Sequence, residues 1–151
     1  NKTIGDLAGP MAFAILMGSS RAFYGKFGDK INLERFMQYS AVLCMVSYLM
    51  IAFIPVPALG ILGCAVCGLS VGIMWPGTFS MAAASVKRGG TALFALLALA
   101  GDVGCSSGPT YVGMISGALN DNLKLGIFAA LIFPVLMIMG IKMIGSLQKY
   151  D

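Results

Sequence analysis

Between Leu59 and Val86 the chain reads LGILGCAVCGLSVGIMWPGTFSMAAASV, a run without one charged side chain. A helix that crosses the hydrocarbon core of a bilayer needs about 20 predominantly apolar residues, because the core is about 30 Å thick and each helical residue rises about 1.5 Å. This run is longer than that minimum. It therefore predicts a membrane-spanning helix, and it makes lipid the relevant solvent for the rest of the chain.

Four further apolar runs of similar length accompany it, at residues 4–24, 36–54, 91–119 and 125–144. Charged residues make up 11% of the chain and the mean hydropathy is +0.89, whereas a soluble domain carries about 25% charged residues. We therefore predict an all-α integral membrane protein with five transmembrane helices. The lipid bilayer is its first expected partner.

The basic residues are unevenly divided between the two sides of the predicted membrane. One side has only Lys2 and Lys124, and the other has Arg21, Lys26, Lys30, Arg35, Lys87, Arg88, Lys142 and Lys149. The positive-inside rule assigns the richer side to the cytoplasm. We expect a bacterial cytoplasmic membrane, with the N-terminus outside and the C-terminus inside. The net charge of +4 follows from this bias and requires no nucleic-acid partner.

The start of the chain does not have the features of a signal peptide. Residues 4–24 are followed by four more spans, and no small-residue cleavage pattern ends them. The chain begins with Asn1, and its first span is predicted to start outside without a targeting segment. We therefore expect a fragment that lacks upstream residues.

Composition removes several classes of chemistry. Without histidine the chain cannot form a Ser-His-Asp triad, a Cys-His pair or a histidine-ligated metal site. Cys64 and Cys67 form a C-x-x-C pattern inside an apolar run, with neither a βαβ context nor a second ligand pair, which favours two small packed residues. No phosphate-loop motif occurs. We expect no cofactor, no metal and no enzymatic activity.

Glycine pairs spaced by four residues predict close helix packing. At that spacing two glycines share a helix face and allow another backbone to approach. The first, third and fourth spans carry such pairs and are expected to pack closely on other helices. The pairs are Gly5/Gly9, Gly68/Gly72, Gly104/Gly108 and Gly113/Gly117.

Two of the spans are long and contain proline. Pro76 follows Met74-Trp75 in the third span, and Pro109 follows Gly108 in the fourth. Proline removes one backbone hydrogen bond and clashes with the preceding turn, so both sites predict kinks. Kinked, glycine-rich helices are typical of transporters, where irregular backbone lines a cavity. A tilted helix with a passive kink accounts equally well for each site taken alone.

The loop after the first span resembles a cytoplasmic loop of the major facilitator superfamily. That family has the pattern G-x-x-x-D-[RK]-x-G-x-[RK]-[RK] between its second and third helices, and a degenerate copy between the eighth and ninth. The matching residues here are Gly25, Asp29 and Lys30, with Arg21 at the place of an arginine often found one turn earlier. Asn32 replaces the second glycine, and Glu34 replaces the first residue of the basic pair.

This divergence favours the degenerate copy, so the resemblance implies helices eight to twelve, most of the C-terminal six-helix bundle. Gly104, Gly108, Pro109 and Gly113 are also similar to the family's glycine-proline motif, here on the eleventh helix. The stretch from Trp75 to Ser80 is faintly similar to the fucose-permease-like branch.

The resemblance implies a gating role for Asp29. In the family this carboxylate latches the two halves of the transporter together, so its partner would lie in a missing N-terminal half. The alternative is an ordinary positive-inside loop in which Asp29 and Glu34 only balance charge.

Asp102 is the one acidic residue deep in a predicted span. Its depth is about 16 Å from Thr91 at 1.5 Å per residue, near the bilayer midplane. A carboxylate there is costly unless it is protonated, paired or facing water. We expect Asp102 to take part in proton or cation coupling, and Asp6, near the outer end of its span, to be structural.

These features favour a secondary transporter that moves a small solute by alternating access. By analogy with the family, Trp75, Thr78 and Ser80, together with Asp102 and Ser106, face the solute cavity. Two other classes remain open: a non-transporting remnant or assembly subunit, and an integral-membrane enzyme, which no motif supports.

Overall fold

The computed structural model describes residues 2–86 and 89–147, and the regular secondary structure of this part of the chain is all helical, without a strand. The all-α prediction is therefore confirmed. The elements are α1 (Lys2–Phe27), the 3-10 helix η1 (Gly28–Lys30), α2 (Leu33–Phe53), α3 (Pro57–Val71), α4 (Met74–Ser85), α5 (Gly90–Ala118), α6 (Leu123–Ala129) and α7 (Ile132–Leu147).

Four stretches of the described chain are long and apolar enough to cross a membrane. They are Leu33–Phe53, Pro57–Ser85, Gly90–Ala118 and Leu123–Ser146, and each of them overlaps nearly all of one predicted span, which accounts for four of the five. The fifth, residues 4–24, lies within α1, which is helical but is not among these four. That α1 crosses the membrane stays a prediction.

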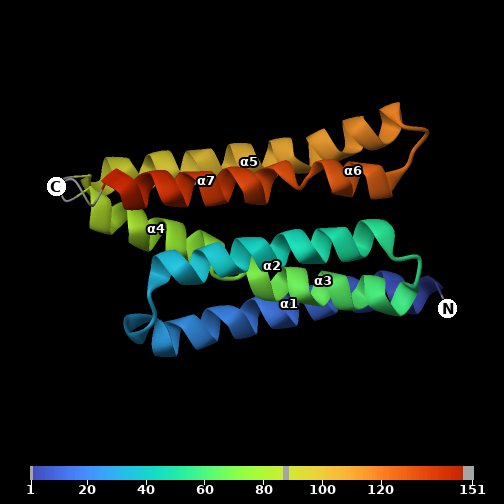
Figure 1. Ribbon diagram of the computed structural model, residues 1–151, viewed down its shortest axis with the longest axis horizontal. Helices are drawn as coiled ribbons and strands as arrows, with labels where there is room; N and C mark the ends of the chain where they lie inside the picture. The colour runs from blue at the N-terminus through green and yellow to red at the C-terminus, as the bar shows by residue number, and fades with distance from the viewer. Residues whose placement is uncertain (1, 87–88, 148–151) are drawn as a thin grey trace.

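The helices run roughly side by side, and the chain turns at alternate ends (Figure 1). One end holds η1, the start of α5 and the end of α7, and the other holds the connections α2–α3 and α5–α6. We call the first the basic end, because Lys26, Lys30 and Arg35 are exposed there. The predicted loop at 25–35 thus lies at the basic end, while Lys87 and Arg88 fall outside the described residues.

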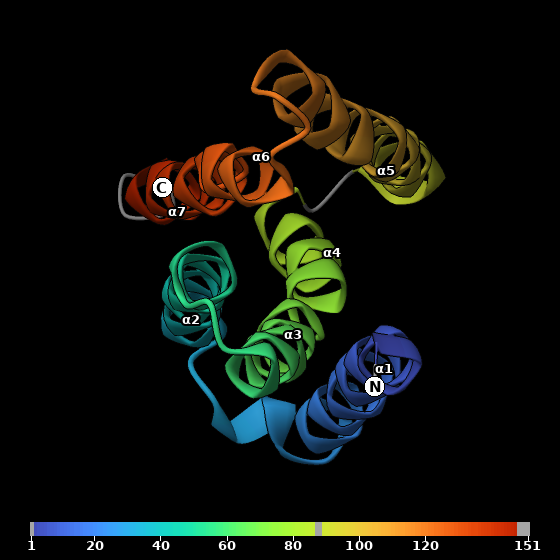
Figure 2. The same cartoon turned by 90° about the vertical axis from the view of Figure 1, so that its right-hand side faces the viewer.

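The helices form two layers joined by α4. Helices α1, α2 and α3 lie in one layer and α5, α6 and α7 in the other, and α4 runs from the first to the second (Figures 1 and 2). Helix α2 packs against both layers, on α3 and on α6 and α7. At the basic end the core residues Met37 of α2, Met81 of α4 and Ile141 of α7 form one buried cluster that ties the layers together.

Helices α1 and α3 are held together at glycines. A Cβ atom at Gly68 would collide with the backbone of Phe13, and one at Gly72 would lie 2.8 Å from the carbonyl oxygen of Met17. Gly68 and Gly72 are four residues apart, and so are Phe13 and Met17, which they meet on α1. The two helices therefore run parallel with their backbones in contact. The close packing predicted from the Gly68/Gly72 pair is present.

Most glycines of helix α5 are not packed against another helix within the described chain. No atom lies within 4 Å of a Cβ built at Gly104, Gly108, Gly113 or Gly117. The helix instead meets α6 at Gly126, where a Cβ would lie 2.7 Å from the carbonyl oxygen of Val112. The close packing expected of these α5 pairs therefore needs a partner outside the described residues.

Two spans are broken one turn before a proline. Because Pro76 has no N–H, the carbonyl of Gly72 loses its helical partner, and α3 ends at Val71 before α4 begins at Met74. In the same way Pro134 cannot donate to the carbonyl of Ala130, which accepts instead from the N–H of Phe133 at 3.1 Å, and α6 ends at Ala129 before α7 begins at Ile132. The kink predicted at Pro76 is thus a break, and the break before Pro134 was not predicted.

Pro109 has a milder effect. It lies inside α5, which is continuous from Gly90 to Ala118, although Figure 1 shows the C-terminal part of α5 bending away from the line of its first part. The lost hydrogen bond therefore bends this helix without ending it.

Candidate functional site

The two helix breaks face a common cavity of about 350 Å³. Val71, Met74 and Trp75 come from the first break, and Phe133, Pro134 and Met137 from the second. Helix α2 contributes the remaining wall with Cys44 and Tyr48, and Thr78 comes from the first turns of α4. Each proline therefore places irregular backbone beside the same hollow.

Few polar groups reach this cavity. The Thr78 hydroxyl donates to the carbonyl oxygen of Met74 at 2.7 Å, which leaves its oxygen able to accept a hydrogen bond. The half-buried Tyr48 lies beside the thiol of Cys44. An apolar hollow with a small number of placed polar groups is the usual form of a small-molecule site.

Trp75 connects the cavity to the second layer. Its ring lies directly on Gly101 of α5, where a Cβ atom would collide with the ring carbons. The Trp75 ring also packs against Phe79 with centroids 4.8 Å apart, and Phe79 stacks on Phe94 of α5 at 5.7 Å. This row of rings fixes α4 against α5, so the position of Trp75 depends on both helices.

The predicted cavity residues fall into separate groups. Trp75 and Thr78 line the cavity together. Ser80, on the same helix, is exposed and donates to the carbonyl oxygen of Pro76 at 3.0 Å, so it lies outside the cavity.

Asp102 and Ser106 lie on the exposed side of α5. They line an open depression of about 470 Å³ together with Val103, Ser107 and Thr110. The Ser106 hydroxyl donates to the carbonyl oxygen of Asp102 at 2.9 Å, and no basic side chain lines the depression. Asp102 directly follows Gly101 in the sequence. The depression and the Trp75 ring therefore involve neighbouring residues of α5.

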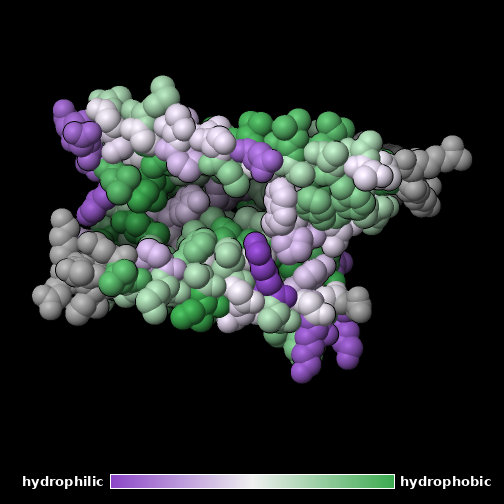
Figure 3. Space-filling view, turned by 180° about the vertical axis from the view of Figure 1, so that it is seen from behind, coloured by the Kyte–Doolittle hydropathy of each residue, from purple (hydrophilic) through white to green (hydrophobic). Residues whose placement is uncertain are grey.

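One side of the molecule is hollowed between the layers. Figure 3 shows this side, with a hollow between the upper and lower halves, and Figure 2 shows α4 set back between α1 and α5. Green and pale side chains make up most of this face, and strongly hydrophilic ones lie near its ends and also near its middle, beside the hollow (Figure 3).

Arg21 has a role that the loop motif did not predict. Its Nε donates to the carbonyl oxygen of Gly72 at 3.2 Å, which is the carbonyl that Pro76 leaves without a helical partner. The arginine thus satisfies the broken backbone of one helix from another. The sequence alone indicates the acceptor, because Pro76 frees the carbonyl of Gly72. It does not indicate Arg21 as the donor, because that contact depends on the packing of α1 on α3.

The other gating candidates are less informative. Gly25 is exposed near the end of α1, with no atom within 4 Å of a Cβ built there. Lys30 is exposed in η1. The backbone of Asp29 belongs to η1, and its side chain lies outside the described part of the structure.

Sequence reasoning missed Cys44, Tyr48, Phe133 and Pro134 as cavity residues. Pro134 was a visible signal, because a proline inside an apolar span predicts a break one turn earlier. The other three have no local signal, since they meet only when α2 packs against α7.

Comparison of the chain with protein-family models, curated proteins and solved structures finds no match. The resemblance to the major facilitator superfamily therefore depends on the motif residues alone.

Proposed function

We propose that the chain is part of a secondary transporter of the major facilitator type, corresponding to helices eight to twelve, which moves a small solute by alternating access. The observation that carries this proposal is the cavity between the two broken helices. An unpaired backbone group costs several kcal/mol in lipid, so broken helices persist in membranes where protein or a water-filled cavity surrounds them. Discontinuous helices of this kind form the solute sites of many transporters.

The cavity supports a particular kind of solute. A volume of about 350 Å³ accommodates a small molecule. The ring of Trp75 offers an apolar face, and Tyr48 and Thr78 offer hydrogen bonds. We therefore propose a small solute with one apolar face and at least one polar group. The rest of the cavity wall would come from the N-terminal half of the transporter, across the hollowed face of Figure 3.

Asp102 is the proposed coupling residue, for a proton or a cation. An intramembrane carboxylate is costly and is usually functional, and the residues around Asp102 in its depression supply no cation. In this proposal the basic end lies in the cytoplasm, as the positive-inside rule requires.

Uptake of a labelled solute panel into proteoliposomes that contain the full-length protein tests the proposal. For the transported solute, Tyr48→Phe and Trp75→Ala should raise the half-saturating concentration, Tyr48→Phe by about fivefold for one lost hydrogen bond. Tyr39→Phe, on an exposed ring of the same helix, should not. Full-length protein that moves no solute, or a Tyr48→Phe variant indistinguishable from Tyr39→Phe, would refute the assignment.

Coupling needs its own measurement. Asp102→Asn should abolish accumulation of solute against its gradient while leaving exchange of internal and external solute intact. If accumulation persists in this variant, Asp102 is not the coupling residue. If exchange is lost as well, Asp102 belongs to a structural pair with a residue outside this chain.

A further inference from the structure

A second, larger cavity lies at the basic half of the α1–α2–α3 layer. It measures about 500 Å³ and does not share a residue with the cavity at the helix breaks. Its walls are largely apolar, with Phe23, Phe36, Tyr39, Leu43 and Leu69. Four serines complete the lining: Ser19, Ser20, Ser40 and Ser70.

Two of these serines are buried but lack hydrogen-bond partners. Ser20 is 7% exposed and Ser40 is 8% exposed. Neither hydroxyl makes a hydrogen bond within the described chain, and neither oxygen is sealed away from the cavity. Ser19 and Ser70, in contrast, donate to the carbonyl oxygens of Ile15 and Cys67. A buried hydroxyl without a partner is unfavourable. A bound molecule that accepts hydrogen bonds from Ser20 and Ser40 would therefore be stabilised in this cavity.

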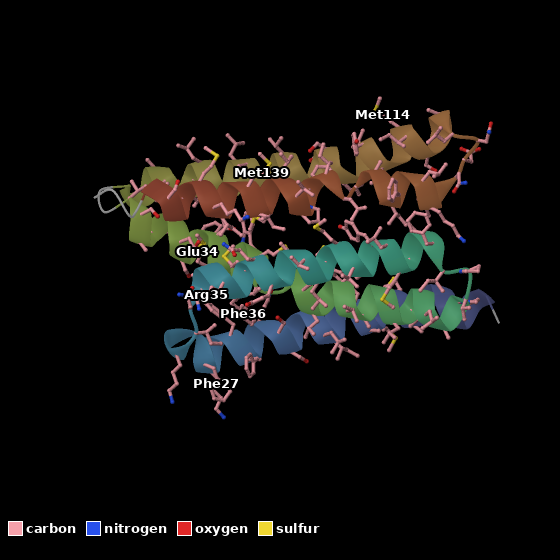
Figure 4. All side chains as sticks on the ribbon, viewed as in Figure 1. Phe27, Glu34, Arg35, Phe36, Met114 and Met139 are labelled. Carbon is pink, nitrogen blue, oxygen red and sulfur yellow. The ribbon has the colours of Figure 1, made fainter. Side chains whose placement is uncertain are left out.

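On both α1 and α2, a basic residue follows the cavity lining toward the basic end. Along α1 the ring of Phe23 packs on Phe27 with centroids 5.0 Å apart, and the Nζ of Lys26 lies 5.5 Å from the centroid of Phe27. Along α2 the exposed Arg35 immediately precedes Phe36. Figure 4 shows Phe27, Arg35 and Phe36 near the same end of the molecule. The cavity thus has an apolar interior and two free hydroxyls. Lys26 on α1 and Arg35 on α2 follow its lining toward the basic end, and Arg35 also lines a separate pocket beside α7.

We propose that this cavity binds an anionic phospholipid of the bilayer. The ester carbonyl oxygens would accept hydrogen bonds from Ser20 and Ser40, and one acyl chain would continue past Leu43 and Leu69, away from the basic end. The phosphate would lie between Lys26 and Arg35, where positive side chains near a membrane surface attract anionic lipid. This inference does not depend on the transport proposal, because the two cavities have no residue in common.

Photo-crosslinking in nanodiscs tests the site with the full-length protein. The probe is phosphatidylglycerol with a diazirine in one acyl chain, and its reference is the phosphatidylcholine with the same chains. Crosslinks mapped by mass spectrometry should concentrate on the facing residues of α1 and α2 and be several-fold more abundant for phosphatidylglycerol. Labelling spread evenly over all lipid-facing helices would overturn the proposal.

Variants separate the parts of the site. Ser40→Leu fills the cavity and should remove the concentrated crosslinks, whereas Ser107→Leu, on the exposed face of α5, should leave them unchanged. Ser20→Ala with Ser40→Ala adds no bulk and should weaken labelling by about fivefold or more, which guards against misfolding of Ser40→Leu. Lys26→Gln with Arg35→Gln should reduce phosphatidylglycerol labelling to the phosphatidylcholine level. Retained preference in that variant, or full labelling in the double alanine variant, would contradict the assignment.

Discussion

Pro57–Ser85 and Gly90–Ala118 have similar sequence features but different structures. Both are 29 residues long, both contain spaced glycines, and both contain proline beyond their midpoint. Yet 39% of the apolar stretch of the first is buried within the chain and none of the second. The first is broken at Gly72 and packs Gly68 and Gly72 on α1, whereas the second is continuous and leaves its spaced pairs Gly104/Gly108 and Gly113/Gly117 open. A glycine pair therefore marks a face that permits contact, and the contact depends on a neighbour.

The same comparison explains why one proline breaks its helix and the other does not. The carbonyl freed by Pro76 is satisfied by Arg21 from α1, so the break has a partner group in place. No side chain from another helix donates a hydrogen bond to the backbone around Pro109 in the described structure, and α5 is continuous there. Tertiary contacts decide how far a proline disrupts a membrane helix.

The largest expected difference between the two spans is in stability. Gly68→Leu forces a side chain into the backbone of Phe13 and should lower the free energy of unfolding by about 3 kcal/mol or more. Gly104→Leu, on the open face of α5, should change it by less than about 1 kcal/mol. Thermal unfolding of both variants in detergent measures this difference. Equal losses would mean that Gly104 is covered by a partner outside the described residues.

The second difference concerns the prolines. Pro76→Ala supplies an N–H that can rejoin the carbonyl of Gly72, which should straighten the span and close the cavity. Solute uptake should fall by about tenfold, equivalent to about 1.4 kcal/mol. Pro109→Ala should leave uptake within about twofold, because α5 is already continuous. If the two variants behave alike, the break at Gly72 has no part in the site.

The smallest effect is expected from Arg21. Arg21→Gln removes the hydrogen bond to the carbonyl of Gly72 and should cost about 1 kcal/mol of stability. In a Pro76→Ala background the carbonyl has a backbone partner, so the same substitution should cost close to nothing. A double-mutant cycle on unfolding free energies measures this coupling. Additive effects would show that Arg21 acts independently of the break.

Much of the fold was predictable because the bilayer imposes simple rules. The length of each apolar run located four spans, and the position of the turns at alternate ends followed from their order. The contact at Gly68 and the disruption at Pro76 also followed from local sequence. Asp102 and Ser106, grouped by analogy with Trp75, instead line a separate depression, since helical phase alone does not say which face a neighbour will cover.

The cavity itself was only partly predictable. Trp75 and Thr78 were identified, but Tyr48 and Phe133 come from distant helices whose meeting depends on packing. Arg21 was assigned to the loop by its motif, whereas its guanidinium reaches the break in α3. Such contacts depend on the tertiary arrangement, and no spacing pattern in the sequence indicates them.

The central claim is that the solute binds between the two helix breaks, and site-directed alkylation tests it most directly. In full-length protein with its native cysteines replaced, Thr78→Cys places a thiol in the cavity, and Ser80→Cys places one on the same helix outside it. The transported solute should slow alkylation of Thr78→Cys by a methanethiosulfonate reagent and leave Ser80→Cys unaffected. Protection of neither thiol, or equal protection of both, would contradict the account.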